Sequence, residues 1–305
     1  MGIRLAAIDV GSNAVRFELG ELVDKKQIQV IHNYRVPIRL GDDSFSKGKI
    51  GDKTIKAVLK AFIEFQQLMI KYDVKYYKAV ATSALRDAKN SEELVDLIFS
   101  TSHIQLDIID GKEEARLVHL SVSHVENISK KNALLIDIGG GSVEFIISIN
   151  GQLKKFYSLN MGTIRLLNRA KKAKAKDLKK YLEKEVRKHL EPILKHKKYF
   201  NCPYDKKIFI GTGGNVKSLG KLGEMFKGNS KNEISAFEIE ILEKLISSYS
   251  VQERIQKLGL KPDRADVILP ATIIIQEIMK AMDFKKIRAP NVGVKDGILI
   301  QLAKF

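Results

Sequence analysis

The stretch LAAIDVGSNAVRF, residues 5–17, decides the fold, because its pattern returns 128 residues further along the chain. The stretch ALLIDIGGGSVEF, residues 133–145, aligns with it without a gap. Each copy predicts an apolar strand that ends in aspartate, a glycine-rich turn and a second strand. One such hairpin is common, but two that lie one domain apart predict a duplicated domain.

Helical and strand patterns alternate between the two hairpins. Residues 52–72 predict a helix whose buried face is formed by Ile55, Val58, Leu59, Phe62 and Ile63. Strands are expected at 76–81 and 104–109, and a capping box from Asn90 to Glu93 is expected to open the helix between them. Alternation at this spacing is typical of parallel α/β units.

The second half repeats the alternation with longer helices. Its predicted elements are a basic helical stretch at 171–198, a strand at 207–210, a helix opened by Ser235 and Glu238, a helix at 264–282 capped by Asp263, and a final helix at 298–305. We expect an N-terminal domain at 1–123 and a C-terminal domain at 124–296, with residues 297–305 packing back onto the first. No Pro-, Ser- or Gly-rich linker separates the halves, so we expect them to pack around a central cleft.

The composition favours a globular protein with polyanionic partners. Of the 305 residues 44% are hydrophobic and 29% are charged, which argues against disorder and against a fibre. Lys and Arg number 53 against 36 Asp and Glu, a formal net charge of +17. A surface of this sign attracts phosphate-rich molecules at long range.

The compartment is predicted to be the cytoplasm. The single cysteine, Cys202, cannot form an intrachain disulfide, and the N-terminus lacks the apolar run of a signal peptide. The most apolar run, 267–275, is half as long as a membrane span and contains Pro270. No membrane partner is therefore expected.

Residues 169–198 carry 13 Lys and Arg against four acidic residues. This stretch is interpreted as a solvated helix face, a track for polyphosphate, or a contact for nucleic acid. Nucleic acid is the weakest of the three, because no aromatic residue interleaves before Tyr181.

The two glycine-rich turns predict a phosphate and metal site. Glycine lets backbone N–H groups approach phosphate oxygens, and an aspartate at the strand end can ligate a hard divalent cation. The metal ligands are expected to be Asp9 and Asp137. The expected phosphate contacts are Ser12 and Asn13 in the first turn and Gly139, Gly140, Gly141 and Ser142 in the second.

Six further positions complete the expected site. Strand alternation places Arg16 and Glu144 on the faces that would line the cleft. Asp110 and Glu113 have capping-box spacing, which leaves Glu114 about 100° further round the helix as a candidate general base. Arg86 lies in an expected first helical turn, where it can bind an anion. Gly213 and Gly214 repeat the strand-to-glycine-loop pattern.

In this order the motifs resemble the exopolyphosphatase and guanosine pentaphosphate phosphohydrolase (Ppx/GppA) family over essentially the whole chain. The matching stretches are AIDVGSN (7–13), ATSALR (81–86), GKEEARL (111–117), IDIGGGS (136–142) with Glu144, MGTIRL (161–166), GTGG (211–214) and GVKDG (293–297). The chain looks like the short, two-domain form of this family.

The resemblance implies a duplicated ribonuclease-H-like α/β fold, shared with actin, sugar kinases and the heat-shock ATPase. It implies hydrolysis of terminal phosphate from polyphosphate or guanosine pentaphosphate, with Mg²⁺ or Mn²⁺ as cofactor. Glu114 would be the general base, and Asp137, Gly139 and Glu144 would position metal, phosphate and water. Asp9, Ser12, Asn13, Arg16 and Arg86 would bind phosphates, and a homodimer is expected.

Three positions depart from the family's usual residues: Ala14 for Ser, Asn215 for Thr, and Pro290 for Ser. Two other functions stay open. A small-molecule kinase of the same fold would share the two hairpins, although such kinases place an aspartate base elsewhere. A non-catalytic sensor of nucleotides or polyphosphate would bind without turnover.

Overall fold

The computed structural model describes residues 2–24, 27–227 and 232–304. The chain divides into two compact units. Unit 1 comprises Met1–Ser121 with Val292–Phe305, and unit 2 comprises Val122–Asn291. Among the described residues, the helices all fall short of the length or the apolarity that crossing a membrane requires.

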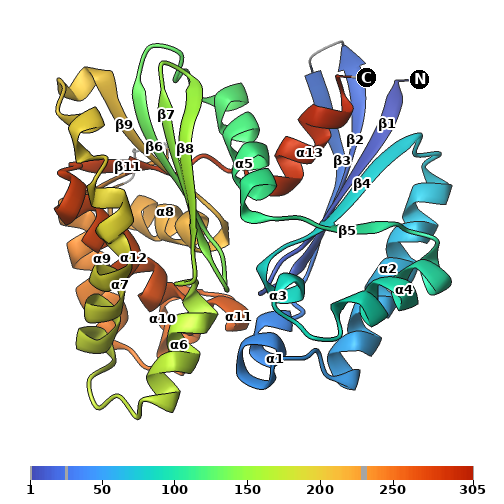
Figure 1. The fold of residues 1–305 in the computed structure, drawn as a ribbon, viewed down its shortest axis with the longest axis horizontal. Helices are drawn as coiled ribbons and strands as arrows, with labels where there is room; N and C mark the ends of the chain where they lie inside the picture. The colour runs from blue at the N-terminus through green and yellow to red at the C-terminus, as the bar shows by residue number, and fades with distance from the viewer. Residues whose placement is uncertain (1, 25–26, 228–231, 305) are drawn as a thin grey trace. The chain divides into compact units, whose positions relative to one another are not determined.

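Unit 1 is built on a five-stranded sheet in the order β3-β2-β1-β4-β5. β1 pairs antiparallel with β2 and parallel with β4, which pairs parallel with β5. Helices α2 and α4 pack together beside this sheet, and α13 contacts β1, β2 and β4 (Figure 1). The elements are β1 (Ile3–Val10), β2 (Val15–Asp24), β3 (Gln27–Val36), α1 (Leu40–Lys47), α2 (Asp52–Lys71), β4 (Tyr76–Ala81), α3 (Ser83–Arg86), α4 (Ser91–Ser102), β5 (Leu106–Ile108), α5 (Gly111–Val125) and α13 (Val294–Leu302).

The core of unit 1 lies between α2 and the hairpin. Phe17 on β2 stacks on Phe65 of α2, with ring centroids 4.9 Å apart. The buried face of α2 is turned slightly from the predicted one, because Ala61 and Phe65 are buried while Ile63 is 38% exposed. Ile63 lies about 100° from the buried Phe62, which carries it to the edge of the packed face.

Unit 2 is built on a six-stranded sheet in the order β10-β11-β9-β6-β7-β8. β6 pairs antiparallel with β7 and parallel with β9. The elements are β6 (Asn132–Ile138), β7 (Val143–Ile149), β8 (Gln152–Leu159), α6 (Thr163–Lys172), α7 (Leu178–Leu194), two 3-10 turns (Lys197–Phe200 and Tyr204–Lys206), β9 (Lys207–Thr212), α8 (Gly214–Lys227), β10 (Glu233–Ser235), α9 (Ala236–Ser248), α10 (Val251–Leu258), α11 (Pro262–Ala265), α12 (Ile268–Met282) and β11 (Lys286–Arg288).

The two sheets are copies of one arrangement, since β8-β7-β6-β9-β11 repeats the order β3-β2-β1-β4-β5. The hairpins agree residue by residue. Asp9 lies opposite Arg16 on β1 and β2, and Asp137 lies opposite Glu144 on β6 and β7. The predicted duplicated α/β fold is therefore confirmed.

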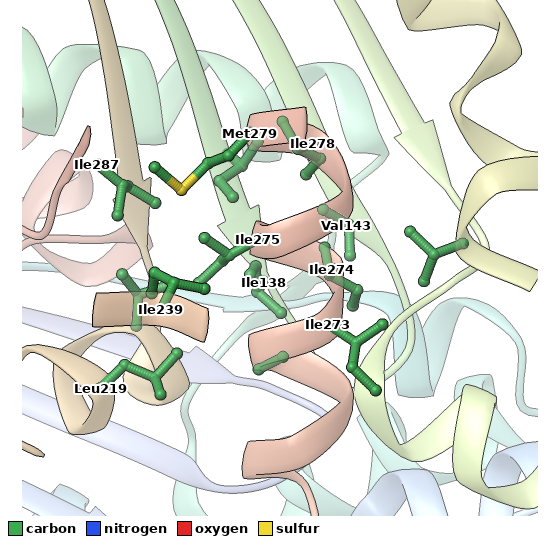
Figure 2. Close-up of a cluster of buried hydrophobic side chains, with 14 of the residues drawn as sticks. Ile138, Val143, Leu219, Ile239, Ile273, Ile274, Ile275, Ile278, Met279 and Ile287 are labelled. Atoms are coloured by element: carbon green, nitrogen blue, oxygen red, sulfur yellow. The ribbon is translucent and has the colours of Figure 1, made fainter. Parts of the chain in front are cut away.

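Helix α12 forms the centre of unit 2. It is buried nearly all round, and its buried residues include the polar Gln276 and Glu277 as well as the apolar ones. Figure 2 shows its isoleucines packed against Ile138 and Val143, the residues that flank the glycine turn of the second hairpin. The core of unit 2 thus holds both strands of the hairpin immediately beside the predicted site.

Several predicted boundaries are wrong. The 171–198 stretch is two helices, because α6 ends at Lys172 and Asp177 caps α7 by accepting from Lys180 N at 3.0 Å. The 264–282 helix is also two, α11 and α12, and Asp263 lies inside α11 behind Pro262, which suits a first helical turn.

Two further helix starts differ from the prediction. The Asn90 side chain bonds the backbone of Ile50 at 2.8 and 2.9 Å instead of capping α4. The last helix begins at Val294, and the Asp296 side chain accepts from Gly293 N at 2.7 Å. The capping box of Ser235 and Glu238 is confirmed.

Candidate functional site

The glycine turn of unit 2 joins β6 to β7. Gly139 N donates to Ser142 O at 3.1 Å, so Gly140 and Gly141 stand at the tip of the turn. The carbonyl groups of residues 139–141 accept hydrogen bonds from the backbone N–H groups of residues 162–165 at the start of α6, at 2.9–3.1 Å. This fixes the direction in which each peptide group of the turn points.

That direction creates an anion site. In a trans peptide the C=O and N–H groups point opposite ways. Since the carbonyls of residues 139–141 point to α6, the N–H groups of Gly140, Gly141 and Ser142 point away from it. Successive N–H groups on one side of a turn form a concave donor set for a phosphate group.

The close approach of α6 depends on Gly162. A Cβ atom at this position would lie 2.3 Å from the carbonyl carbon of Gly141. A side chain here would push α6 off the turn and release the carbonyls. MGTIRL therefore contributes the backbone that orients the turn, a role that its sequence did not reveal.

Two carboxylates lie at the strand ends beside this turn. Asp137 and Glu144 are directly opposite each other on β6 and β7, so both side chains project from the same face of the sheet. Thr212 Oγ1 donates to Asp137 Oδ1 at 2.6 Å, and Ser158 Oγ donates to Glu144 Oε1 at 2.8 Å. Oxygen ligands of this kind suit a divalent cation such as Mg²⁺ or Mn²⁺.

The second glycine loop of unit 2 continues β9. Gly213 has φ +95°, and a Cβ atom there would lie 2.9 Å from Ile138 O and 3.1 Å from Asp137 Oδ1. Gly214 leaves room for the buried guanidinium of Arg264, whose Nη1 lies 3.3 Å from Asn215 Oδ1. Glycine is therefore needed at 213 for close packing against Asp137 and at 214 for close packing against Arg264.

The turn of unit 1 has the same construction. Gly11 N donates to Ala14 O at 3.1 Å, and Gly41 N at the start of α1 donates to Ser12 O at 2.8 Å. The N–H group of Asn13 therefore points away from α1. Ser12 and Asn13 are buried at the tip.

The strand-end pair of unit 1 carries opposite charges. Arg16 Nη1 donates to Asp9 Oδ2 at 2.6 Å, and the Asp9 side chain is only 5% exposed. An arginine thus occupies the place that Glu144 has in unit 2, and it neutralises the carboxylate that was expected to bind metal. Asp9 as placed here is suited to hold Arg16.

Glu114 lies in the first turn of α5 and pairs with Arg86. Arg86 Nη1 donates to Glu114 Oε2 at 3.2 Å and to Ile109 O at 2.6 Å. This contact fixes the position of the Glu114 carboxylate, and a general base must be held in place to accept a proton. Arg86 is the last residue of α3, a single helical turn that begins at Ser83, so the expected place of Arg86 in a first helical turn is confirmed.

The neighbouring Glu113 is structural. Asp110 caps α5 by accepting from Glu113 N at 2.8 Å, as the spacing predicted. The Glu113 carboxylate turns to Arg116, which donates to it at 2.6 and 2.8 Å, and these bonds hold the pKa of Glu113 below its ordinary value. Two adjacent glutamates therefore have different partners.

Three positions near the predicted residues had no role assigned from the sequence: Gly162, Thr212 and Arg264. Thr212 lies inside the GTGG motif, but its contact with Asp137 depends on the pairing of β6 with β9, which are 75 residues apart in the chain at this point. In the sequence, the only sign of this role is that Thr212 lies just before a glycine loop at the end of a strand, a place comparable to that of Asp137.

The comparisons with known proteins agree over the full length. The Ppx/GppA phosphatase family model matches residues 21–304. Exopolyphosphatase 1 of Mycobacterium bovis is 23% identical over 309 residues, which cover 98% of this chain and 88% of that protein.

Two solved structures share the fold. An exopolyphosphatase from Cytophaga hutchinsonii has a TM-score of 0.89 at 23% identity, covering 98% of this chain and 97% of that one. The Aquifex aeolicus member of the Ppx/GppA family has a TM-score of 0.77 at 21% identity, with the same coverage. These likenesses show that the chain shares the fold of both structures, in agreement with the repeated sheet order of the two units.

Proposed function

The chain belongs to the Ppx/GppA phosphatase family, and from this we propose that it is a phosphoanhydride hydrolase that releases the terminal phosphate of inorganic polyphosphate. The exopolyphosphatase named among its relatives supports this substrate, and guanosine pentaphosphate is the second candidate. The observation that carries the proposal is the turn at 139–142, whose N–H groups point away from α6 beside two carboxylates.

The backbone of the turn binds the terminal phosphoryl group in this proposal. The N–H groups of Gly140, Gly141 and Ser142 would donate to its oxygens, and Gly213 and Gly214 would let the chain approach closely. Fixed donors of this kind stabilise charge that develops on the phosphoryl oxygens in the transition state.

We propose that residues of the first hairpin also bind phosphate. Ser12 and Asn13 would bind through the turn that matches 139–142. Arg16, held by Asp9, and Arg86 would neutralise charge on the phosphates. We thus assign Asp9 to the orientation of Arg16 and not to the metal, because its carboxylate already faces a guanidinium at 2.6 Å.

Glu114 is the proposed general base. It would accept a proton from water as the water oxygen forms a bond to the terminal phosphorus. The bond from that phosphorus to the bridging oxygen breaks, which yields orthophosphate and a chain one phosphate shorter. The ion pair with Arg86 supports this role, because it holds the carboxylate in a defined position.

Asp137 and Glu144 would hold the divalent cation. Their oxygen donors fit Mg²⁺ or Mn²⁺, and Thr212 and Ser158 orient them. When bound, the ion supplies charge neutralisation at the phosphoryl oxygens.

The test is a comparison of substrates. Orthophosphate release is measured with long-chain polyphosphate, with guanosine pentaphosphate, and with ATP plus a panel of small-molecule acceptors, each with Mg²⁺ and with excess chelator. We expect release from polyphosphate that chelation abolishes and added Mg²⁺ restores. Phosphorylated acceptor without polyphosphate hydrolysis would identify a kinase, and tight binding of polyphosphate without turnover would identify a sensor.

A further inference from the structure

The GVKDG stretch, residues 293–297, opens α13, and the proposed function gives it no role. Two of its residues form the helix start, because Gly293 N donates to Asp296 Oδ2 at 2.7 Å. Two others, Lys295 and Gly297, contact neighbouring elements instead. Their contacts join α13 to β2 and to α5, the helix that carries Glu114.

Lys295 anchors α13 to β2 through a buried ion pair. Its Nζ atom donates to Glu18 Oε2 at 2.6 Å, and the Glu18 side chain is only 2% exposed. Asn33 Nδ2 on β3 donates to the same carboxylate oxygen. Because a buried charge is costly without its partner, this pair fixes the place of α13 on the sheet.

Glu18 lies on the same face of the sheet as Arg16. The two residues are two positions apart on β2, and side chains at this spacing project from one face. Phe17 and Leu19 project from the other face, where they belong to the core that includes α2. The sheet is therefore held from one face by its core, while α13 is anchored on the other.

Gly297 lets α13 pack closely on α5 (Figure 1). A Cβ atom at this position would lie 2.2 Å from Leu117 O and 3.0 Å from Leu117 Cα, so a side chain would force the two helices apart. Four residues further along α13, Gln301 Oε1 accepts from Arg116 Nη2 at 2.9 Å. Residues at this spacing share one side of a helix, so Gly297 and Gln301 both face α5.

Glu114 lies less than one helical turn before this contact. It precedes Leu117 by three residues on α5, which is about 4.5 Å along the helix axis. A displacement of α5 at Leu117 therefore also moves Glu114. Because Arg86 Nη1 lies 3.2 Å from Glu114 Oε2, a shift of about 1 Å would break that contact.

We propose that Lys295 and Gly297 are positioning residues that act through Glu114. The inference rests on the proposed function, in which Glu114 is the general base. The ion pair fixes α13 on β2, and the glycine sets how closely α5 lies on α13. Together they determine where the Glu114 carboxylate stands relative to the sheet. A misplacement of about 1 Å at a reacting group can lower the rate about 10²-fold.

Gly297→Ala tests the contact between the helices. The control is Gly223→Ala on α8, where the nearest neighbour of a Cβ atom would lie at an ordinary 3.8 Å. We expect kcat to fall about 10- to 100-fold in Gly297→Ala, because α5 moves. The KM for polyphosphate should stay within about twofold of wild type, because the core holds the strands in place. The control should match wild type in both values.

A double-mutant cycle separates positioning from a general loss of structure. Gly297→Ala is also introduced into the Glu114→Gln protein, and the residual kcat of the two proteins is compared. If the glycine acts through Glu114, its replacement has little further effect once the base is absent. An equal loss of kcat in both backgrounds would overturn the inference.

A second variant tests the ion pair should Gly297→Ala fail to fold. Glu18→Gln combined with Lys295→Met removes both charges, so no lone charge is buried. We expect kcat to fall while KM is kept, and this loss should also vanish in the Glu114→Gln background. Lys295→Arg, which preserves the charge, should retain most of the wild-type kcat. A wild-type kcat in the folded double variant would overturn the positioning role of Lys295.

Amide hydrogen exchange tests the same link without turnover. We expect residues 113–120 to exchange at least about tenfold faster in Gly297→Ala than in Gly223→Ala, and α2 to exchange as in wild type. Unchanged exchange at 113–120 would overturn the inference and leave the proposed function intact. Faster exchange there supports the hold of α13 on α5 even where wild type hydrolyses nothing, an outcome that would refute the proposed function alone.

Discussion

Asp137 and Glu144 lie directly opposite each other on β6 and β7, at the register that Asp9 and Arg16 occupy on β1 and β2. The equivalent cross-strand position therefore holds an ion pair in the first hairpin and two adjacent carboxylates in the second. Two like charges at a cross-strand position repel each other, so a cation that bridges them relieves the repulsion.

Replacing Glu144 tests this relationship. We expect Glu144→Gln to raise the Mg²⁺ concentration for half-maximal phosphate release at least about tenfold, because one anionic ligand is lost. Calorimetric titration with Mn²⁺ gives the same comparison without substrate. Glu191→Gln, an exposed glutamate on α7, is the matched control. Equal cation affinity in all three proteins would remove Glu144 from the metal site.

Thr212 tests how Asp137 is oriented. Thr212→Val keeps the shape of the side chain but removes the donor that lies 2.6 Å from Asp137 Oδ1. We expect cation affinity to fall about tenfold or more, as for other residues that orient a ligand, and Thr212→Ser to restore most of it. If Thr212→Val lowers stability while cation affinity stays at the wild-type value, the threonine serves only the fold.

A substitution at Gly162 tests whether the packing of α6 sets the direction of the N–H groups that are proposed to bind phosphate. In Gly162→Ala the new methyl group meets the Gly141 backbone, so α6 shifts and the carbonyls of 139–141 lose their partners. We expect KM for polyphosphate to rise sharply and kcat to fall. Gly220→Ala on α8 is the control, since its nearest neighbour would lie at an ordinary 3.7 Å. Similar kinetics for the two variants would show that α6 does not orient the turn.

His119 on α5 gives a pH prediction. Burial lowers the pKa of His119, so the unfolded chain binds its proton more tightly than the folded one does. Stability should therefore fall as the pH drops below the ordinary histidine pKa of about 6.5, and the loss should continue down to the lowered value.

Urea unfolding across this range measures the effect. We expect His119→Gln to flatten the pH dependence of the unfolding midpoint and the exposed His103→Asn to leave it as in wild type. A steeper dependence in His119→Gln, or an unchanged one, would contradict the assignment to burial.

Local patterns were enough to predict the hairpins and most elements. Asp9 and Asp137 could be placed at strand ends because the alternation, the glycines and the repeat all act over a few residues. The glutamates of α5 were also separable, since Asp110 caps the helix as the spacing required. Strands and helix caps depend on residues that are close together in the sequence, so the sequence alone is enough to predict them.

Contacts between distant segments could not be read in this way. The Thr212–Asp137 bond needs the pairing of β6 with β9, and the role of Gly162 needs the packing of α6 on the turn. The helix break before Asp177 and the pairing of Asp9 with Arg16 likewise depend on which of several partners a side chain reaches. In each case several local arrangements are compatible with the sequence, and tertiary packing decides which of them forms.

Phosphate release from long-chain polyphosphate with Mg²⁺ tests the central claim most directly, with wild type, Glu114→Gln and Glu113→Gln compared side by side. The two substitutions are chemically identical and adjacent, but only Glu114 pairs with Arg86, while Glu113 is bound to Arg116. We predict that Glu114→Gln lowers kcat about 10²–10⁴-fold, the usual contribution of a general base, and that Glu113→Gln stays near wild type. Release at the wild-type rate by Glu114→Gln would contradict the account.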